Sequence, residues 1–255
     1  MITVIILCKN EENNIIGCLN SLEWSDEIII VDDYSNDATV ELVNSLNNKK
    51  ITLYQRHLEN DFSAQRNYGL QKAKGDWVLF VDSDERVSES LQYEIVGSVN
   101  TSLNNISGFY IKRVDHMWGK RLRFGEPSHV KLLRLGRKEQ GLWIGKVHER
   151  WEVSGKLGEL KNNLIHYPHP DTVTFLKEIN FYTNLRSEEL YYKNIRTNMY
   201  SIIVFPLVKF IKNFILRLGF LDGVRGLLFA VMMSFHSFLV RGKLWWLWEK
   251  KKVNK

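Results

Sequence analysis

The sequence has few cysteines and none of the features of an export signal. Cys8 and Cys18 are the only cysteines among 255 residues, which excludes the disulfide framework of a small secreted domain. Met1 leads directly into the apolar residues 2–7, without a basic segment or a small-residue cleavage site. These absences favour a reducing compartment, and we expect a cytoplasmic protein.

Long uncharged segments are also absent. A spanning helix needs about 20 consecutive apolar residues, whereas the longest uncharged run, residues 226–240, has 15 and includes His236. We therefore expect helices that lie in a membrane interface or re-enter it, attached to the inner face of the cytoplasmic membrane. No internal repeat or low-complexity linker occurs, and 255 residues suffice for one sizeable domain with an appendage.

Positive charge is concentrated near the C-terminal end of the sequence. Residues 199–255 contain ten Lys or Arg residues against two acids, a formal charge of +8, so the first 198 residues carry −2 of the overall +6. Apolar runs fill the same segment, and Trp245, Trp246 and Trp248 lie beside its lysines. This combination indicates a membrane surface and not nucleic acid. The alternative is a helical hairpin that packs on the domain or on another subunit, and the oligomeric state stays open.

Strands and helices alternate through the first 90 residues. The patterns predict strands at residues 2–7, 27–31, 51–54 and 76–81, and helices at 11–22, 38–46 and 63–73. This alternation predicts an α/β fold with a mostly parallel sheet flanked by helices. Ligands bind beyond the carboxyl ends of such strands, and here those ends carry residues 9–11, Asp32-Asp33 and residues 82–85.

The acids at residues 82–85 form a DxD motif. Asp82 and Asp84 stand at positions i and i+2 after a predicted buried strand. Two such carboxylates can share Mg²⁺ or Mn²⁺ and the diphosphate that the cation carries, because these ions prefer hard oxygen ligands. Taken alone, the segment is equally consistent with a solvated acidic turn.

Four motifs in order resemble family 2 glycosyltransferases of the GT-A fold. They are Ile5-Ile6-Leu7-Cys8-Lys9-Asn10-Glu11-Glu12, Val31-Asp32-Asp33-Tyr34-Ser35-Asn36-Asp37-Ala38-Thr39, Ala64-Gln65-Arg66-Asn67-Tyr68-Gly69 and Asp82-Ser83-Asp84. Later segments resemble the bacterial lipopolysaccharide core β-1,4-glucosyltransferase branch, namely Val147-His148-Glu149, His166-Tyr167-Pro168-His169 and Gly219-Phe220-Leu221-Asp222-Gly223. The resemblance implies a GT-A domain in residues 1–198 and an apolar, basic helical membrane-surface region in residues 199–255. Within the domain we expect a nucleotide-sugar half at 1–100, an acceptor half at 101–170 and a linking helix at 171–198.

The resemblance also implies a nucleotide-sugar site. Asp33 would accept the N–H of a uracil base with Glu11 nearby on base or ribose, although helix capping is the alternative for Asp33. Arg66 would face the diphosphate, because a guanidinium suits phosphate oxygens, unless it is a solvated helix charge. Asp82 would touch ribose and metal, and Asp84 would hold the metal. The implied nucleotide-sugar residues are Cys8, Glu11, Asp33, Arg66, Asp82 and Ser83.

Inverting transfer requires a general base for the acceptor hydroxyl, while the metal neutralises the departing diphosphate. The resemblance assigns this base to Glu149, although family members often carry an Asp-bearing motif here. A salt bridge to Arg150 or Lys146 is the alternative. His166, with His169 near it, is a candidate metal ligand or phosphate contact, or a structural histidine. Trp118, Trp143 and Trp151 either stack on sugar rings or pack in the core.

The resemblance therefore implies an inverting, metal-dependent hexosyltransferase. The expected reaction moves glucose from UDP-glucose to a lipopolysaccharide inner-core heptose or another lipid-linked envelope glycan. A polyprenyl-phosphate glycosyltransferase explains the apolar tail equally well. A sugar-1-phosphate nucleotidyltransferase is disfavoured because residues 8–14 contain no glycine. A non-catalytic scaffold is disfavoured because Asp82, Asp84 and Glu149 are all present.

Overall fold

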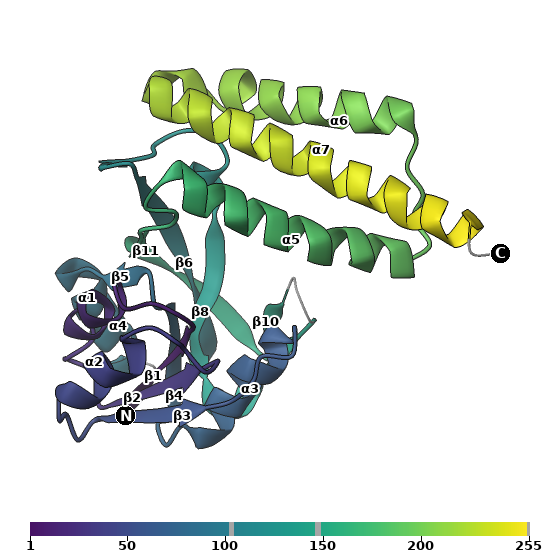
Figure 1. The fold of residues 1–255 in the computed structure, drawn as a ribbon. Helices are drawn as coiled ribbons and strands as arrows, with labels where there is room; N and C mark the ends of the chain where they lie inside the picture. Colours follow the sequence, from purple (N-terminus) through teal and green to yellow (C-terminus); the bar gives the residue numbers. More distant parts are fainter. Residues whose placement is uncertain (102–104, 146–148, 254–255) are drawn as a thin grey trace. The chain divides into compact units, whose positions relative to one another are not determined.

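The structure is a computed structural model that describes residues 1–101, 105–145 and 149–253. The chain forms two compact units (Figure 1). Unit 1 comprises Met1–Arg113 and Val130–His166, and unit 2 comprises Val114–His129 and Tyr167–Lys255. The linking helix predicted at 171–198 corresponds to α5 (Thr172–Tyr192), which belongs to unit 2.

Unit 1 is built on one sheet whose first half is parallel. Strands β3, β2, β1 and β4 lie side by side in that order and pair in parallel. Strand β8 continues the sheet antiparallel to β4, followed by β6, β11 and β5. The bounds are β1 (Ile2–Cys8), β2 (Glu27–Asp32), β3 (Ile51–Gln55), β4 (Trp77–Asp82), β5 (Glu85–Val87), β6 (Ile106–Met117), β8 (Lys131–Arg137) and β11 (Lys156–His166). The predicted α/β fold is confirmed, and the antiparallel strands extend its parallel part.

Helices cover both faces of this sheet. In β1, Val4 and Ile6 face one core cluster and Ile5 faces the other, because successive strand residues point to opposite sides. The first cluster receives α1 (Ile15–Asn20), α2 (Thr39–Ser45) and α4 (Glu89–Asn100). The second receives α3 (Phe62–Lys72) and the hairpin of β9 (Gly141–Ile144) and β10 (Arg150–Val153). Burial on both faces explains the continuous apolar runs of these strands.

The strand register aligns the carboxyl ends of β1, β2 and β4. Cys8 pairs with Asp32, and Leu7 pairs with Asp82. The backbone N–H of Asp33 donates to the carbonyl of Cys8 at 3.0 Å. The predicted convergence of three acidic segments at one edge of the sheet is therefore observed.

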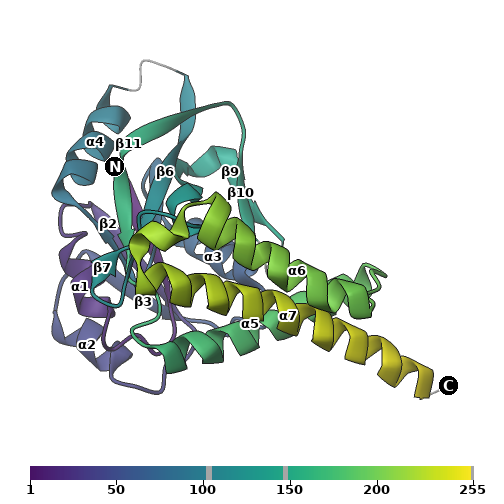
Figure 2. The same cartoon turned by 90° about the horizontal axis from the view of Figure 1, so that it is seen from above.

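In unit 2, α7 (Val224–Val253) lies beside both α5 and α6 (Met199–Ile211), as both views show (Figures 1 and 2). Phe175 and Ile179 of α5 share a core cluster with Phe229 of α7. The Asp222 carboxylate accepts the backbone N–H groups of Arg123 and Phe124, which gives the Gly219–Asp222 segment a structural role. The remaining elements are β7 (Lys120–Arg121), turns of 3₁₀ helix at Pro127–His129, Lys138–Gln140 and Gly219–Asp222, and a π-helical turn at Lys212–Leu216.

The two C-terminal helices expose large apolar side chains. These are Met199, Tyr200, Ile203, Phe205, Leu207, Val208 and Ile211 on α6, and Val224, Leu227, Leu228, Val231, Phe235, Phe238, Trp245 and Trp246 on α7. By length and composition alone, Met199–Leu216 and Val224–Lys251 are long and apolar enough to cross a membrane, although few of their residues are buried. The interfacial placement expected from the sequence stays a prediction.

Gly69 lies where helix α3 packs closely on strand β1. A Cβ atom at Gly69 would be 2.6 Å from Cγ2 of Ile5, a fully buried side chain. We expect Gly69→Ala to lower the free energy of unfolding by about 1–3 kcal/mol through overpacking, measured by urea denaturation. Gly97→Ala is the matched control: Gly97, like Gly69, stands four residues before the C-cap of its helix, and a Cβ there would meet nothing within 4 Å. The control should stabilise by about 0.4–1 kcal/mol, and equal effects of the two changes would contradict the packing.

Candidate active site

Asp82, at the end of β4, is held between two arginines. Its Oδ1 accepts Nη2 of Arg66 on α3 at 2.9 Å, and its Oδ2 accepts Nη2 of Arg134 on β8. Burial acts to raise the pKa of Asp82, but the two guanidinium groups outweigh it and hold the pKa well below its usual range. Asp82 therefore carries a fixed negative charge.

Arg66 also contacts Glu149, the predicted general base. Its Nε donates to Glu149 Oε1 at 3.2 Å, so one side chain connects the DxD loop with the segment before β10. Arg150 and Lys146 are the alternative salt-bridge partners expected for Glu149. Arg150 pairs with Glu152 and not with Glu149. Lys146 lies outside the described residues, as do Val147 and His148 of the Val-His-Glu motif.

Glu85 lies beneath this cluster and is completely buried. Its Oε2 accepts the backbone N–H of Asp82 at 2.9 Å, and its Oε1 lies 3.5 Å from Arg134 Nη2 and 4.0 Å from Arg113 Nη1. Burial raises the pKa of Glu85 above its ordinary value. Glu85 and Arg134 together fix the position of the turn that carries Asp82.

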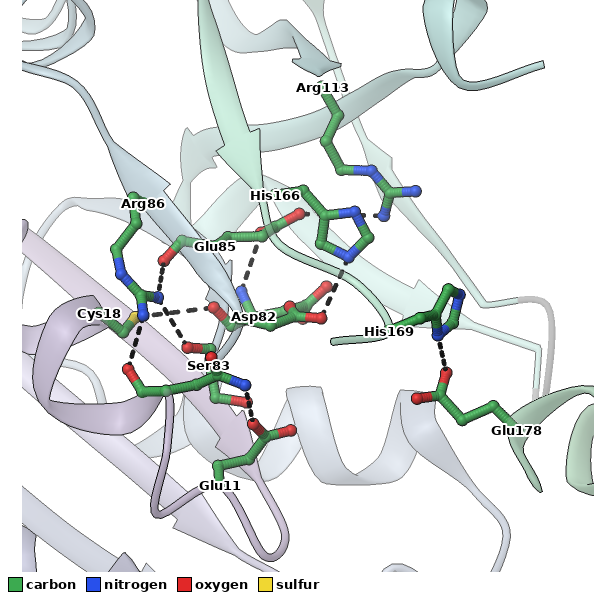
Figure 3. Close-up of polar contacts among 12 residues, drawn as sticks. Glu11, Cys18, Asp82, Ser83, Glu85, Arg86, Arg113, His166, His169 and Glu178 are labelled. Atoms are coloured by element: carbon green, nitrogen blue, oxygen red, sulfur yellow. Dashed lines mark hydrogen bonds and ion pairs between the residues drawn. The ribbon is translucent and has the colours of Figure 1, made fainter. Parts of the chain in front are cut away.

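Asp84 and His166 are brought together by pairing of β5 with β11. Glu85 pairs with His166 in this register (Figure 3), and His166 Nε2 lies 3.1 Å from Asp84 Oδ2. His169, in unit 2, is held separately: its Nδ1 lies 2.9 Å from Glu178 and its ring stacks on Phe175. His166 is therefore the histidine of this pair that lies at the acidic turn.

The Asp84 and His166 pair offers a carboxylate and an imidazole to a divalent cation. No group of three or more metal-binding side chains occurs among the described residues. Such ions are nevertheless often held by one or two protein groups, with substrate phosphates and water completing the shell. The residues present fit a cation held in this way. Both oxygens of Asp82 lie on arginines, so its predicted place as a metal ligand stays a prediction.

Asp33 lies in a second polar cluster at the same edge of unit 1. Its Oδ2 accepts Lys9 Nζ at 2.6 Å, and its Oδ1 accepts the backbone N–H of Leu58 at 3.0 Å. It caps no helix; Ser35 instead bonds to Asp32. Beside it, the rings of Tyr34 and His57 stack with centroids 4.1 Å apart.

The other predicted nucleotide-site residues have local partners. The Cys8 thiol is buried 3.6 Å from Asp32 Oδ1, and burial raises its pKa. Glu11 accepts the side-chain amide of Asn14 at 2.8 Å. The Ser83 carbonyl accepts Nη1 of Arg86, whose Nη2 donates to the Asn14 carbonyl and so ties the acidic turn to the start of α1 (Figure 3).

A cavity of about 470 Å³ opens beside Glu149 in unit 1. Its wall includes Arg66, Arg134, Trp143 and Tyr110. Trp143 and Trp151 are buried and pack edge-on against Phe80, each with centroids 4.9 Å apart, so core packing accounts for most of their surface. Trp118 packs near Phe175 in unit 2.

Four residues of this region were not predicted from the sequence: Arg134, Glu85, Arg86 and Tyr110. Arg134 had no motif to mark it, although an arginine inside the apolar strand Lys131–Arg137 is a signal of a buried ion pair. Glu85 was counted with the acidic turn but received no role. Tyr110 is exposed on an otherwise largely buried strand, which is a signal only when the cavity is known.

Replacing Arg134 would leave Asp82 and Glu85 without their shared cation. We expect Arg134→Met to lower the free energy of unfolding by about 1–3 kcal/mol, because Asp82 Oδ2 and the buried Glu85 carboxylate lose a charged donor while Arg66 and Arg113 remain. Lys131→Met, on the same strand, removes an exposed pair with Glu159 and should cost about 0–1 kcal/mol. Urea denaturation measures both, and similar small losses would contradict the role of Arg134.

Asp33 should contribute a pH-dependent stability. Burial raises the pKa of Asp33, but the hydrogen bonds from Lys9 and Leu58 outweigh it and hold the pKa below its ordinary value. The contribution is full above the unfolded pKa of about 3.9 and is lost as pH falls through the folded pKa. Urea denaturation between pH 7 and pH 3 should show that Asp33→Asn costs stability at neutral pH and progressively less in acid. Asp76→Asn, at a highly exposed carboxylate, is the control, and a pH-independent cost at Asp33 would contradict the ion pair.

Comparisons with known proteins identify the family of the chain. The family model described as glycosyl transferase family 2 matches residues 3–148. LpsC of Rhizobium meliloti (strain 1021), a lipopolysaccharide core biosynthesis glycosyltransferase, is 26% identical over 252 residues, covering 96% of this chain and 92% of LpsC. An uncharacterized glycosyltransferase of Rickettsia typhi is 25% identical over 95% of this chain and 86% of its own length.

Solved structures of S. aureus TarS are also similar. TarS aligns with a TM-score of 0.49 and 17% identity over 72% of this chain, so the match spans 39% of the TarS chain. TarS 1–349 in complex with UDP-GlcNAc aligns with a TM-score of 0.48 and 15% identity over 93% of this chain and 81% of that fragment. On the strength of the family match and of the parallel sheet that carries its motifs, the chain belongs to glycosyl transferase family 2 and is a glycosyltransferase with the GT-A fold.

Proposed function

We propose that this enzyme transfers a hexose, glucose from UDP-glucose, to a lipopolysaccharide inner-core sugar or another envelope glycan, with inversion and with a divalent cation. The observation that carries the proposal is the bridge made by Arg66. This side chain lies 2.9 Å from Asp82 Oδ1 and 3.2 Å from Glu149 Oε1. Asp82, on the loop proposed to bind the donor, and Glu149, the proposed base, therefore contact the same guanidinium group.

Glu149 is the proposed general base. The acceptor hydroxyl oxygen forms a bond to the anomeric carbon, and its proton passes to Glu149. The bond from the anomeric carbon to the diphosphate oxygen breaks, and its electron pair leaves with UDP. Arg66 donates hydrogen bonds to that diphosphate, because a guanidinium matches phosphate oxygens.

Asp84 and His166 are the proposed cation ligands. Arg66, Arg134 and Arg113 face three carboxylates, those of Asp82, Glu149 and Glu85, so the arginines have little unbalanced charge to offer a diphosphate. When bound, Mg²⁺ or Mn²⁺ would neutralise the charge that grows on the departing diphosphate. The pair at 3.1 Å lies on the loop where that charge is needed.

The polar cluster around Asp33 is the proposed uracil site. Asp33 is an ionised acceptor for a base N–H, since the hydrogen bonds from Lys9 and Leu58 favour its charged form. The stacked rings of Tyr34 and His57 offer an exposed aromatic face for a base.

The acceptor proposal rests on the relative LpsC and on the exposed apolar helices of unit 2. LpsC is named for lipopolysaccharide core biosynthesis, and α6 and α7 expose rows of large apolar side chains. We place these helices at the cytoplasmic membrane surface, where a lipid-linked acceptor is presented. The same surface favours a second candidate, transfer to a polyprenyl phosphate.

The test is turnover of a panel of UDP- and GDP-sugars with dephosphorylated and intact envelope acceptors, with and without EDTA. We expect UDP-glucose turnover that falls at least about a hundredfold without Mg²⁺ or Mn²⁺, and a product of inverted configuration by NMR. Glu149→Gln should lower kcat by about 10²–10⁴ while donor affinity is retained, and Asp84→Ala should abolish the response to added metal.

Glu139→Gln is the control for the base, because Glu139 is a highly exposed carboxylate outside the cavity. Normal transfer by Glu149→Gln would remove Glu149 as base. Full turnover in EDTA would reject the metal, and transfer only to polyprenyl phosphate would select the second candidate.

A further inference from the structure

The cavity beside Glu149 has more hydrogen-bond donors than the chain itself satisfies. Arg66 and Arg134 line it and are only 5% and 4% exposed. Nη1 of Arg66 and Nε of Arg134 are buried, and neither has a hydrogen-bond partner among the described residues. A buried donor without a partner costs about 1–3 kcal/mol. Both atoms are shielded from solvent, so a ligand with oxygen acceptors in the cavity would recover this cost only where these side chains turn toward it.

The outer wall of the cavity carries two further cations. Lys131 and Arg150 line it and are about half and about three-quarters exposed. Lys131 pairs with Glu159 and Arg150 pairs with Glu152. Exposed pairs of this kind contribute little stability, so both cations can turn to an anion on a ligand at little cost.

The cavity also contains features that suit a sugar ring. Tyr110 is exposed on its wall and offers an aromatic face, whereas Trp143 and Trp151, which also line it, are buried and stack on one another. An exposed aromatic ring and nearby hydrogen-bond donors around one space suit an oxygen-rich saccharide. With Lys131 and Arg150 at the rim, they match a saccharide that carries negative charge.

We propose that this cavity binds an anionic sugar of the acceptor, one that bears a phosphate or a carboxylate. The anionic group lies on Lys131 and Arg150, and the attacking hydroxyl faces Glu149. The proposal rests on the proposed transfer reaction and adds the chemical class of the acceptor. The donor diphosphate is the other anion that could meet these cations, and the experiment separates the two.

The experiment measures binding by calorimetry on the full chain. The probe is a deacylated inner-core oligosaccharide in three forms: intact, dephosphorylated with hydrofluoric acid, and with its carboxylates reduced to alcohols. We expect the intact form to bind about tenfold or more tightly than at least one neutralised form. The form that loses affinity identifies the anion as phosphate or carboxylate.

Variants of Lys131 and Arg150 test whether the difference in affinity arises at the rim of the cavity. Lys131→Met and Arg150→Met should each weaken binding of the intact form about three- to tenfold and leave the weakest neutralised form nearly unchanged. Lys161→Met, at an exposed lysine on β11 outside the cavity, should behave as wild type. Titration with UDP-glucose should give the same affinity in all four proteins.

Equal binding of the three oligosaccharide forms, or no binding of any, would overturn the proposal. So would a loss of UDP-glucose affinity in Lys131→Met or Arg150→Met, because the rim would then serve the donor. Selective binding of the intact form without any sugar transfer would support the acceptor class and count against the proposed reaction alone.

Discussion

The charge on Asp82 is the constraint around which the site is organised. Asp82 stands at the end of a strand buried on both faces, where an isolated carboxylate would lose its hydration without replacement. Arg66 arrives from helix α3 and Arg134 from strand β8, so two elements that are distant in sequence must pack on β4 for this charge to be tolerated. The packing of α3, through the close contact of Gly69 with Ile5, is therefore part of the chemistry as well as of the fold.

The same constraint limits what the arginines can do. Because each arginine of this cluster already faces a carboxylate, its guanidinium group can still donate hydrogen bonds but carries little unbalanced positive charge. Glu85 adds a third carboxylate to this cluster. Its completely buried side chain accepts the backbone N–H of Asp82 and lies beside Arg134. This arrangement suits a site that orients a diphosphate precisely and leaves its neutralisation to a separate cation.

Local patterns in the sequence were sufficient for the parallel half of the fold. Apolar runs predicted β1, β2 and β4, and the acids after these strands were expected to converge at one edge of the sheet, because parallel strands end together. The antiparallel half of the sheet could not be predicted from local patterns, because the pairing of β5 with β11 joins residues about 80 positions apart. His166 was a candidate from its motif alone, and only that pairing places it beside Asp84. Arg134 carried no motif, and its role exists only through partners on β4 and β5.

The two units differ in how they treat apolar surface, and this difference bears on the proposed acceptor. Unit 1 buries its large aliphatic side chains in two layers on the sheet, as a water-exposed catalytic domain requires. Unit 2 leaves long rows of Leu, Ile, Val and Phe exposed on α6 and α7, next to basic residues. A monomeric soluble protein rarely exposes so large an apolar patch, and anionic lipid would attract the nearby cations. An enzyme bound to such a surface encounters a lipid-linked acceptor by diffusion in two dimensions. Its affinity for the sugars of the acceptor can then serve to select the correct hydroxyl. A charged group beside that hydroxyl, bound by the exposed cations at the cavity rim, would contribute to this selection. It would add no buried charge around Asp82.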